Sequence, residues 1–231
     1  MTVGAIKRLQ AQRFRATYAD LLASSSHGPA ARFFLEELYG DRDFSERDAQ
    51  FGQIAGAIEK LFPEAVGELA VDLAETHSLT ESLDHGMAER WPSRKGTRSN
   101  QIEADRDAAS LSRDYVLAWR AVGERALRLR QLAVVMHMGT ELQSLTRKRT
   151  LRMALRMMRT PALAAGLGDL QQFLERGFDA FAQMHDPSGF LQCIQEREST
   201  WIDLLFDGDS KEVALRLAHE LSAVSHESPP V

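Results

Sequence analysis

Apolar side chains recur every three or four residues along this chain, which is the spacing that places them on one face of an α-helix. A clear example runs through Phe51, Ile54, Ile58 and Leu61. The strict alternation of apolar and polar residues that marks a half-buried strand is missing. We therefore predict an all-α fold, a multi-helix bundle of about eight to ten helices with no sheet.

Capping residues, prolines and glycines divide this pattern into separate helices. Ser45 with Asp48 and Ser78 with Glu81 have capping-box spacing, and the second pair predicts a helix break near His77. Gly139 marks a place where a long helix could bend. The expected helical segments cover residues 3–23, 29–39, 45–62, 63–76, 79–90, 110–123, 124–159, 161–165, 169–184, 187–206 and 209–225.

The 231 residues are enough for one large helical core, and no internal repeat divides them. We expect a single helical domain over 1–231. Turn formers and charged residues gather near 91–102, which predicts a mobile loop, and the prolines of 226–231 predict a frayed C-terminal tail.

The composition is that of an ordinary globular protein, with 44% hydrophobic and 26% charged residues. No apolar stretch approaches the roughly 18 residues that a membrane span requires, and we expect no membrane partner. A secretory leader is not expected from the charged and amphipathic first residues. Cys193 is the single cysteine and cannot form an internal disulfide, so a reducing compartment, the cytoplasm, is predicted.

Charge is unevenly distributed although the net charge is only −5. Residues 120–160 carry ten basic and two acidic groups, whereas 161–231 carry four and twelve. Arg149, Arg152, Arg156 and Arg159 fall on one face of a basic amphipathic helix. Such a face could bind phosphates, a membrane surface or an acidic protein. The opposing interpretation is pairing with the chain's own acids, namely Glu36, Glu37, Asp41, Asp43, Glu46 and Asp48.

We favour structural ion pairs for these arginines. The sequence shows no recognition helix and no basic aromatic platform, and its isoelectric point is near 5.8. Binding to nucleic acid is therefore not expected.

His77, Glu81, Asp84 and His85 form the most metal-like set, because on one continuous helix they would share a face. However, the Ser78–Glu81 capping box would leave His77 outside the helix. A solvated polar face is the favoured interpretation of these four residues.

His137 stands between Val134-Val135-Met136 and Met138, the most apolar setting of the seven histidines. A buried imidazole beside methionines could ligate a haem iron, but a hydrogen-bonded core histidine is the favoured alternative. Cys193 lies on the apolar side of its expected helix and is interpreted as a core residue. No hydrolase, nucleotide-binding or paired-cysteine motif occurs, so we predict no cofactor and name no catalytic residue.

Three phrases of the sequence resemble a family of uncharacterised bacterial helical proteins. They are FFLEELYGDRDFSERD at 33–48, TRKRTLRMALRMMR at 146–159 and GLGDLQQFLERGFDAFAQM at 166–184. The resemblance implies a bacterial source and an all-helical fold. It implies no activity, ligand or catalytic residue.

Three functional hypotheses follow from these observations. The leading one is a non-catalytic helical interaction protein that acts as a homodimer, because amphipathic helices are abundant and chemical constellations are few. The second is a helical protein that binds an apolar ligand or haem between the phenylalanine-rich stripe and the methionine-rich residues 136–158. The third is an enzyme of unrecognised type, which would need acids and histidines that converge in a cleft.

Overall fold

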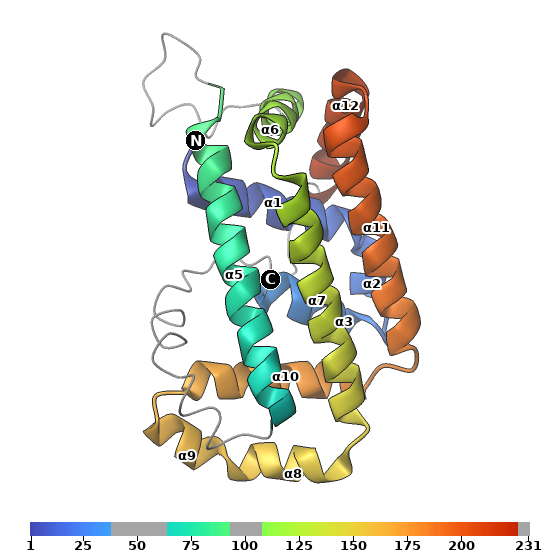
Figure 1. Ribbon diagram of the computed structural model, residues 1–231. Coiled ribbons are helices and arrows are strands. Elements are labelled where there is room, and N and C mark those ends of the chain that lie inside the picture. Colours follow the sequence, from blue (N-terminus) through green and yellow to red (C-terminus); the bar gives the residue numbers. More distant parts are fainter. Residues whose placement is uncertain (38–63, 93–107, 226–231) are drawn as a thin grey trace.

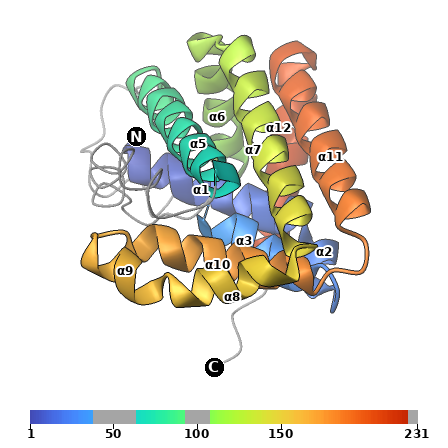
Figure 2. The same cartoon turned by 60° about the horizontal axis from the view of Figure 1, so that its bottom comes forward.

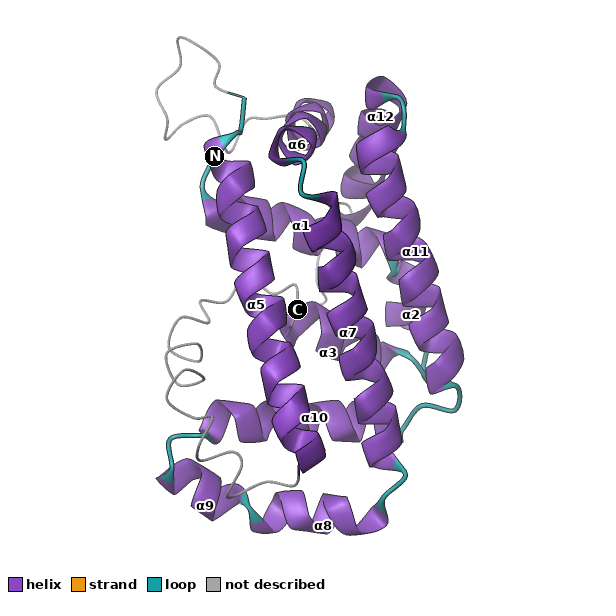
Figure 3. Cartoon of the chain, viewed as in Figure 1, coloured by secondary structure: helices purple, strands orange, loops and turns teal. Residues whose placement is uncertain are grey.

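The computed structural model describes residues 1–37, 64–92 and 108–225. Within these ranges the chain is helical and contains no strand, which confirms the all-α prediction (Figure 3). The expected helix at 45–62 and the tail at 226–231 lie outside the described residues, as do most of the loop near 91–102 and residues 38–48 of the first family phrase.

The described residues form eleven helices. In chain order they are α1 (Val3–Thr17), α2 (Ala19–Ala23), α3 (Gly28–Glu37), α5 (Glu64–Glu89), α6 (Ala108–Val122), α7 (Arg125–Thr146), α8 (Arg149–Met157), α9 (Arg159–Ala164), α10 (Gly168–Ala182), α11 (Pro187–Asp207) and α12 (Ser210–Ser225).

The predicted break near His77 is wrong, because α5 runs without interruption from Glu64 to Glu89. Its apolar face continues through the expected break, with Leu73 and Leu83 both buried. The Thr80 hydroxyl donates a hydrogen bond to the carbonyl of Thr76 at 2.8 Å, inside the helix. Burial of a continuous apolar face therefore outweighs the local capping preference of Ser78.

The expected helix at 124–159 is divided, but the division falls at Lys148 rather than at Gly139. Gly139 lies within α7 and packs against α11, where an added Cβ atom would overlap Leu191 Cδ2. The glycine thus allows two helices to approach closely, and it does not end a helix.

The long helices α5, α7 and α11 lie side by side, with α7 between the other two (Figure 1). Helix α1 crosses this layer and packs against α5 and α12, and α12 also packs against α6. Helices α8, α9 and α10 close one end of the molecule, and α10 contacts α3, α7, α8 and α9 (Figure 2). No described helix is both long and apolar enough to cross a lipid bilayer.

The buried side chains form two clusters. The cluster at the α10 end is rich in phenylalanine and includes Phe14, Phe33, Phe34, Phe173, Phe178, Phe181 and Phe190. The other cluster lies around α6 and α12 and includes Tyr115, Trp119 and Trp201. Met136 of α7 packs against both clusters, so α7 links the two halves of the core.

Candidate interaction site

Helix α8 is attached to the molecule by one face only. Leu151 and Leu155 are buried, and the Leu155 carbonyl accepts a hydrogen bond of 2.6 Å from the Gln171 amide of α10. On the opposite side, Met153 is 65% exposed and Met157 is 73% exposed. Leu163 of α9 is also 65% exposed. Large contiguous apolar patches often mark interaction surfaces, and Met153 and Met157 lie one turn apart on α8.

Arginines lie between the buried and the exposed apolar side chains of this region. Arg152 Nη2 lies 2.6 Å from Asp179 Oδ1, and Arg159 Nη2 lies 2.6 Å from Glu175 Oε2. The hydrogen bond from Arg159 holds the pKa of Glu175 below its ordinary value. Arg156 is exposed. The side chain of Arg149 lies outside the described part of the structure.

The acidic partners of these arginines differ from the predicted ones. Their acids belong to α10, whereas the sequence pointed to the acid-rich segment that starts at Glu36. Glu37 of that segment pairs instead with Arg176, at 2.8 Å. The acids Asp41, Asp43, Glu46 and Asp48 lie outside the described residues.

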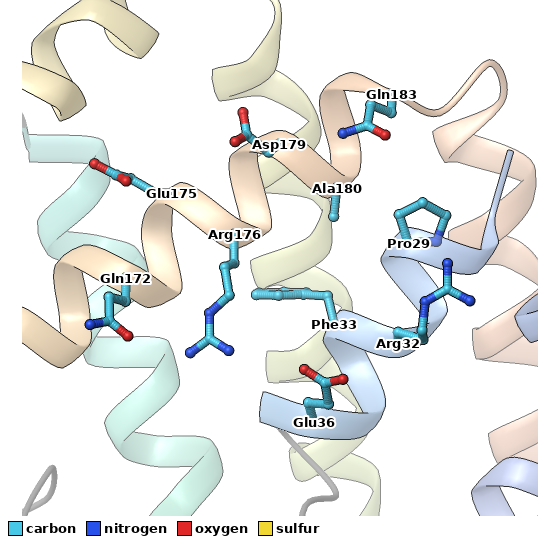
Figure 4. Close-up of a pocket in the computed structure, with 10 residues that line it drawn as sticks. All are labelled: Pro29, Arg32, Phe33, Glu36, Gln172, Glu175, Arg176, Asp179, Ala180 and Gln183. Carbon is cyan, nitrogen blue, oxygen red and sulfur yellow. The ribbon is translucent and has the colours of Figure 1, made fainter. Parts of the chain in front are cut away.

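A pocket of about 450 Å³ lies on the other flank of α10, between α10 and α3 (Figure 4). The Phe33 ring extends between the two helices, and the Arg176 side chain points into the space between them. The ten lining residues are Pro29, Arg32, Phe33, Glu36, Gln172, Glu175, Arg176, Asp179, Ala180 and Gln183. Both guanidinium groups already have partners, because Arg32 donates to the Leu22 carbonyl at 3.2 Å and Arg176 pairs with Glu37.

These features follow one another across a single layer, α8–α10–α3, which we call the docking layer. Its order is an apolar row (Met153 and Met157), a basic row (Arg152, Arg156 and Arg159), an acidic row (Glu175 and Asp179), and then the pocket. The acidic row separates the arginines from the pocket because it binds the former and lines the latter.

The predicted metal set is divided by the structure. His77 and His85 both lie near Glu81, with nitrogen–oxygen distances of 3.7 and 3.9 Å, and Lys7 also pairs with Glu81. Asp84 points away from them into the core and is fully buried. Among the described residues, no group of three histidine, cysteine or acidic side chains is placed to hold a metal ion.

Asp84 belongs to a buried polar cluster instead. Its Oδ1 accepts a hydrogen bond of 3.0 Å from Gln10 of α1, and its Oδ2 has no hydrogen-bond partner among the described residues. Burial raises the pKa of Asp84 to about 6, and the nearby charge of Arg128 opposes that rise. Arg128 is itself buried, with its guanidinium carbon 3.9 Å from the centre of the Trp119 ring. The prediction that these residues form a solvated polar face is therefore wrong for Asp84.

The predicted buried setting of His137 is wrong. Its side chain is 54% exposed, and its Nδ1 lies 2.6 Å from Asp72 Oδ2 of α5. The hydrogen bond to Asp72 raises the pKa of His137. The valines and methionines around it in sequence occupy the buried side of α7, so the imidazole is directed away from the core. This removes the apolar environment that motivated a haem ligand.

Cys193 is partly buried and packs against the phenylalanine-rich cluster, as a core residue would. Burial raises the pKa of its thiol. A raised thiol pKa lowers the thiolate fraction, which does not favour a nucleophilic role.

Sequence reasoning missed the pocket and the apolar row. The pocket joins α3 to α10, and no local pattern shows that these distant helices are neighbours. The apolar row did have a signal, since Met153 and Met157 are one turn apart and lie opposite Leu151 and Leu155.

One family model, described as "Domain of unknown function (DUF8198)", matches residues 1–212. The chain belongs to this family. The DUF8198 match includes α1 to α11, and hence the whole docking layer. No curated protein and no solved structure matches the chain. Because the function of DUF8198 is unknown, a function has to be argued from the chemistry of the site.

Proposed function

We propose that this protein is a non-catalytic helical interaction protein that acts as a homodimer through its docking layer. The observation that carries the proposal is the apolar row, Met153 and Met157, which is exposed beside a row of arginines. Methionine and arginine are both enriched at protein interfaces. A bacterial source, implied by the family resemblance, and a cytoplasmic location, suggested by the lone Cys193, fit this role.

Charge supports a second copy as the occupant. The docking layer carries a basic row beside an acidic row. Two copies can therefore meet with the arginines of one copy opposite the carboxylates of the other, so that groups of like charge do not face each other. A lipid surface or a nucleic acid is uniformly anionic and would be repelled by Glu175 and Asp179. The layer is formed by three helices, α8, α10 and α3, and stable contacts bury about 800 Å² per subunit.

The test is the mass of the full chain in solution, measured by light scattering over a range of concentrations. We expect twice the 25.8 kDa of one chain for the wild type. The double variant Met153→Glu, Met157→Glu should have the mass of one chain, because two carboxylates would then be placed in an apolar contact.

A matched control is available on other faces of the molecule. Val71 of α5 and Leu215 of α12 are each 66% exposed, so Val71→Glu, Leu215→Glu makes the same change in charge at the same exposure. This variant should remain a dimer. A monomeric wild type at all concentrations would refute the proposal, and dissociation of the control to the same extent would refute the docking layer as the contact.

A further inference from the structure

The structure also indicates how two copies fit together, an inference that rests on the proposed homodimer. We infer that Met153 and Met157 of each copy insert into the pocket between α3 and α10 of the other copy. The contact is isologous, which means that the same surface is used by both copies.

The order of the rows comes from helix geometry. Successive residues of an α-helix are rotated by about 100°, so in α8 the side chains two positions beyond Leu151 and Leu155 point away from the core. These are Met153 and Met157, and Arg152 and Arg156 lie between the two directions. From the exposed side of α8 toward α3, the docking layer therefore consists of the apolar row, the basic row, the acidic row and the pocket.

A twofold axis can lie in such a surface in two main ways. An axis across the rows would bring each row against its own copy, which opposes arginine to arginine. An axis that runs parallel to the helices, between the basic and acidic rows, places each row of one copy opposite a different row of the other copy. The basic row then meets the acidic row of the other copy, and the apolar row meets the pocket. Only the second arrangement is complementary at every position.

The pocket suits methionine. Its volume of about 450 Å³ lies within the roughly 300–1,000 Å³ of pockets that enclose small molecules, and two thioether ends require less. Phe33, Ala180 and Pro29 give it an apolar part, in which Phe33 and Ala180 are each only 6% exposed, and sulfur contacts an aromatic ring favourably. The other seven lining residues are polar or charged. Unbranched methionine adapts to an irregular space without a fixed shape.

The ion pairs support the same arrangement. Arg152 and Arg159 are about half exposed although each is paired within its own chain, so their outer N–H groups remain accessible to a second carboxylate. Arg156 stands between them and faces solvent. In the dimer these three guanidinium groups lie over Glu175 and Asp179 of the second copy, which extends each ion pair into a four-membered network.

The axis also fixes which residues meet. Position along the helices is preserved, so Met153, beside the Arg152–Asp179 pair, meets the end of the pocket near Gln183. Met157 lies toward the Arg159–Glu175 pair and meets the end near Gln172. The two glutamines are exposed and lie at opposite ends of the pocket-lining face of α10, which makes them suitable for cross-linking.

The experiment joins two copies by a disulfide in the background Cys193→Ala. One full-length chain carries Met157→Cys and the other carries Gln172→Cys, and the two are mixed under mild oxidation with glutathione disulfide. We expect a rapid cross-link in this mixture, and little in either variant alone, because each new cysteine faces a different residue of the other copy. Mixing Met157→Cys with Gln183→Cys should cross-link at least ten times more slowly, which corresponds to about 1.4 kcal/mol.

Each outcome has one meaning, provided that circular dichroism shows an unchanged thermal transition. A dimeric mass without the Met157–Gln172 cross-link would refute this arrangement and leave the homodimer standing. Rapid cross-linking of Met157→Cys to itself would show that like rows face each other and would also refute it. A monomeric mass for the wild-type chain and for every variant would refute both proposals.

Discussion

Replacing Asp84 with Asn should change how the stability of this protein depends on pH. Asp84 is fully buried, one of its oxygens has no hydrogen-bond partner among the described residues, and burial raises its pKa from an ordinary 3.8 to about 6. The folded state therefore holds a proton at Asp84 over a pH range in which the unfolded state has released it. Asparagine keeps an oxygen that accepts the Gln10 hydrogen bond and has no charge to titrate.

The size of the effect follows from the difference in pKa. A raised pKa in the folded state contributes stability that is complete below pH 3.8 and is lost as the pH rises through about 6. Each unit of difference corresponds to about 1.4 kcal/mol, so the wild type should lose about 3 kcal/mol relative to Asp84→Asn across that window. The attraction between ionised Asp84 and Arg128 is already contained in the pKa of about 6, so it makes no separate contribution to this difference.

Urea unfolding at half-unit steps from pH 3.5 to 8 would measure this difference, with the free energies extrapolated to water. Asp20→Asn is a control of opposite sign. The hydrogen bond from Arg197 lowers the pKa of Asp20, so that carboxylate contributes stability above pH 3.8 that is lost as the pH falls below this value. If the free energy of unfolding changes with pH by the same amount in the wild type and in Asp84→Asn between pH 4 and 7, the reasoning is refuted.

Four further predictions concern stability and binding. Glu198→Gln should cost about 3 kcal/mol in urea unfolding, because the buried carboxylate accepts two hydrogen bonds from Arg13 and one from Tyr18. Gly139→Val should cost about 1–3 kcal/mol, since the new side chain would overlap Leu191, and an unchanged unfolding midpoint would contradict the close α7–α11 contact. The double variant Arg152→Gln, Arg156→Gln should lower the free energy of unfolding of the monomer by no more than about 1 kcal/mol, because both side chains are solvent-exposed. DNA binding of the wild type in a filter assay should vanish near physiological salt.

Most helices could be predicted from the sequence because burial on one face leaves a periodic trace. The errors have a common cause. Ser78 and Glu81 have the spacing of a helix start, yet α5 continues because Leu73 and Leu83 are buried in one continuous face. His137 has apolar neighbours in sequence, but at 100° per residue its own direction is outward. Local composition thus identified the helix and misjudged the orientation of one residue in it.

The site was only partly predictable. The basic row was visible because its members are regularly spaced in the sequence, although Arg159 begins α9 and the other two lie in α8. The acids that bind it come from α10. The pocket depends on Phe33 and Arg176, which are more than a hundred positions apart. Such pairings are set by tertiary packing, and a single sequence contains no direct record of them.

The position of α1 has a consequence for the synthesis of the chain. Arg13 and Tyr18 hydrogen-bond with Glu198 of α11, and Thr17 donates a hydrogen bond of 2.7 Å to Glu220 of α12. A ribosome adds roughly 5–20 residues per second, so α1 waits on the order of ten seconds or more for these partners to be made. During that interval Phe14, which is fully buried in the folded chain, lacks the later-made members of its cluster, such as Phe181 and Phe190. The N-terminal helix therefore reaches its final packing only after α11 and α12 have been made.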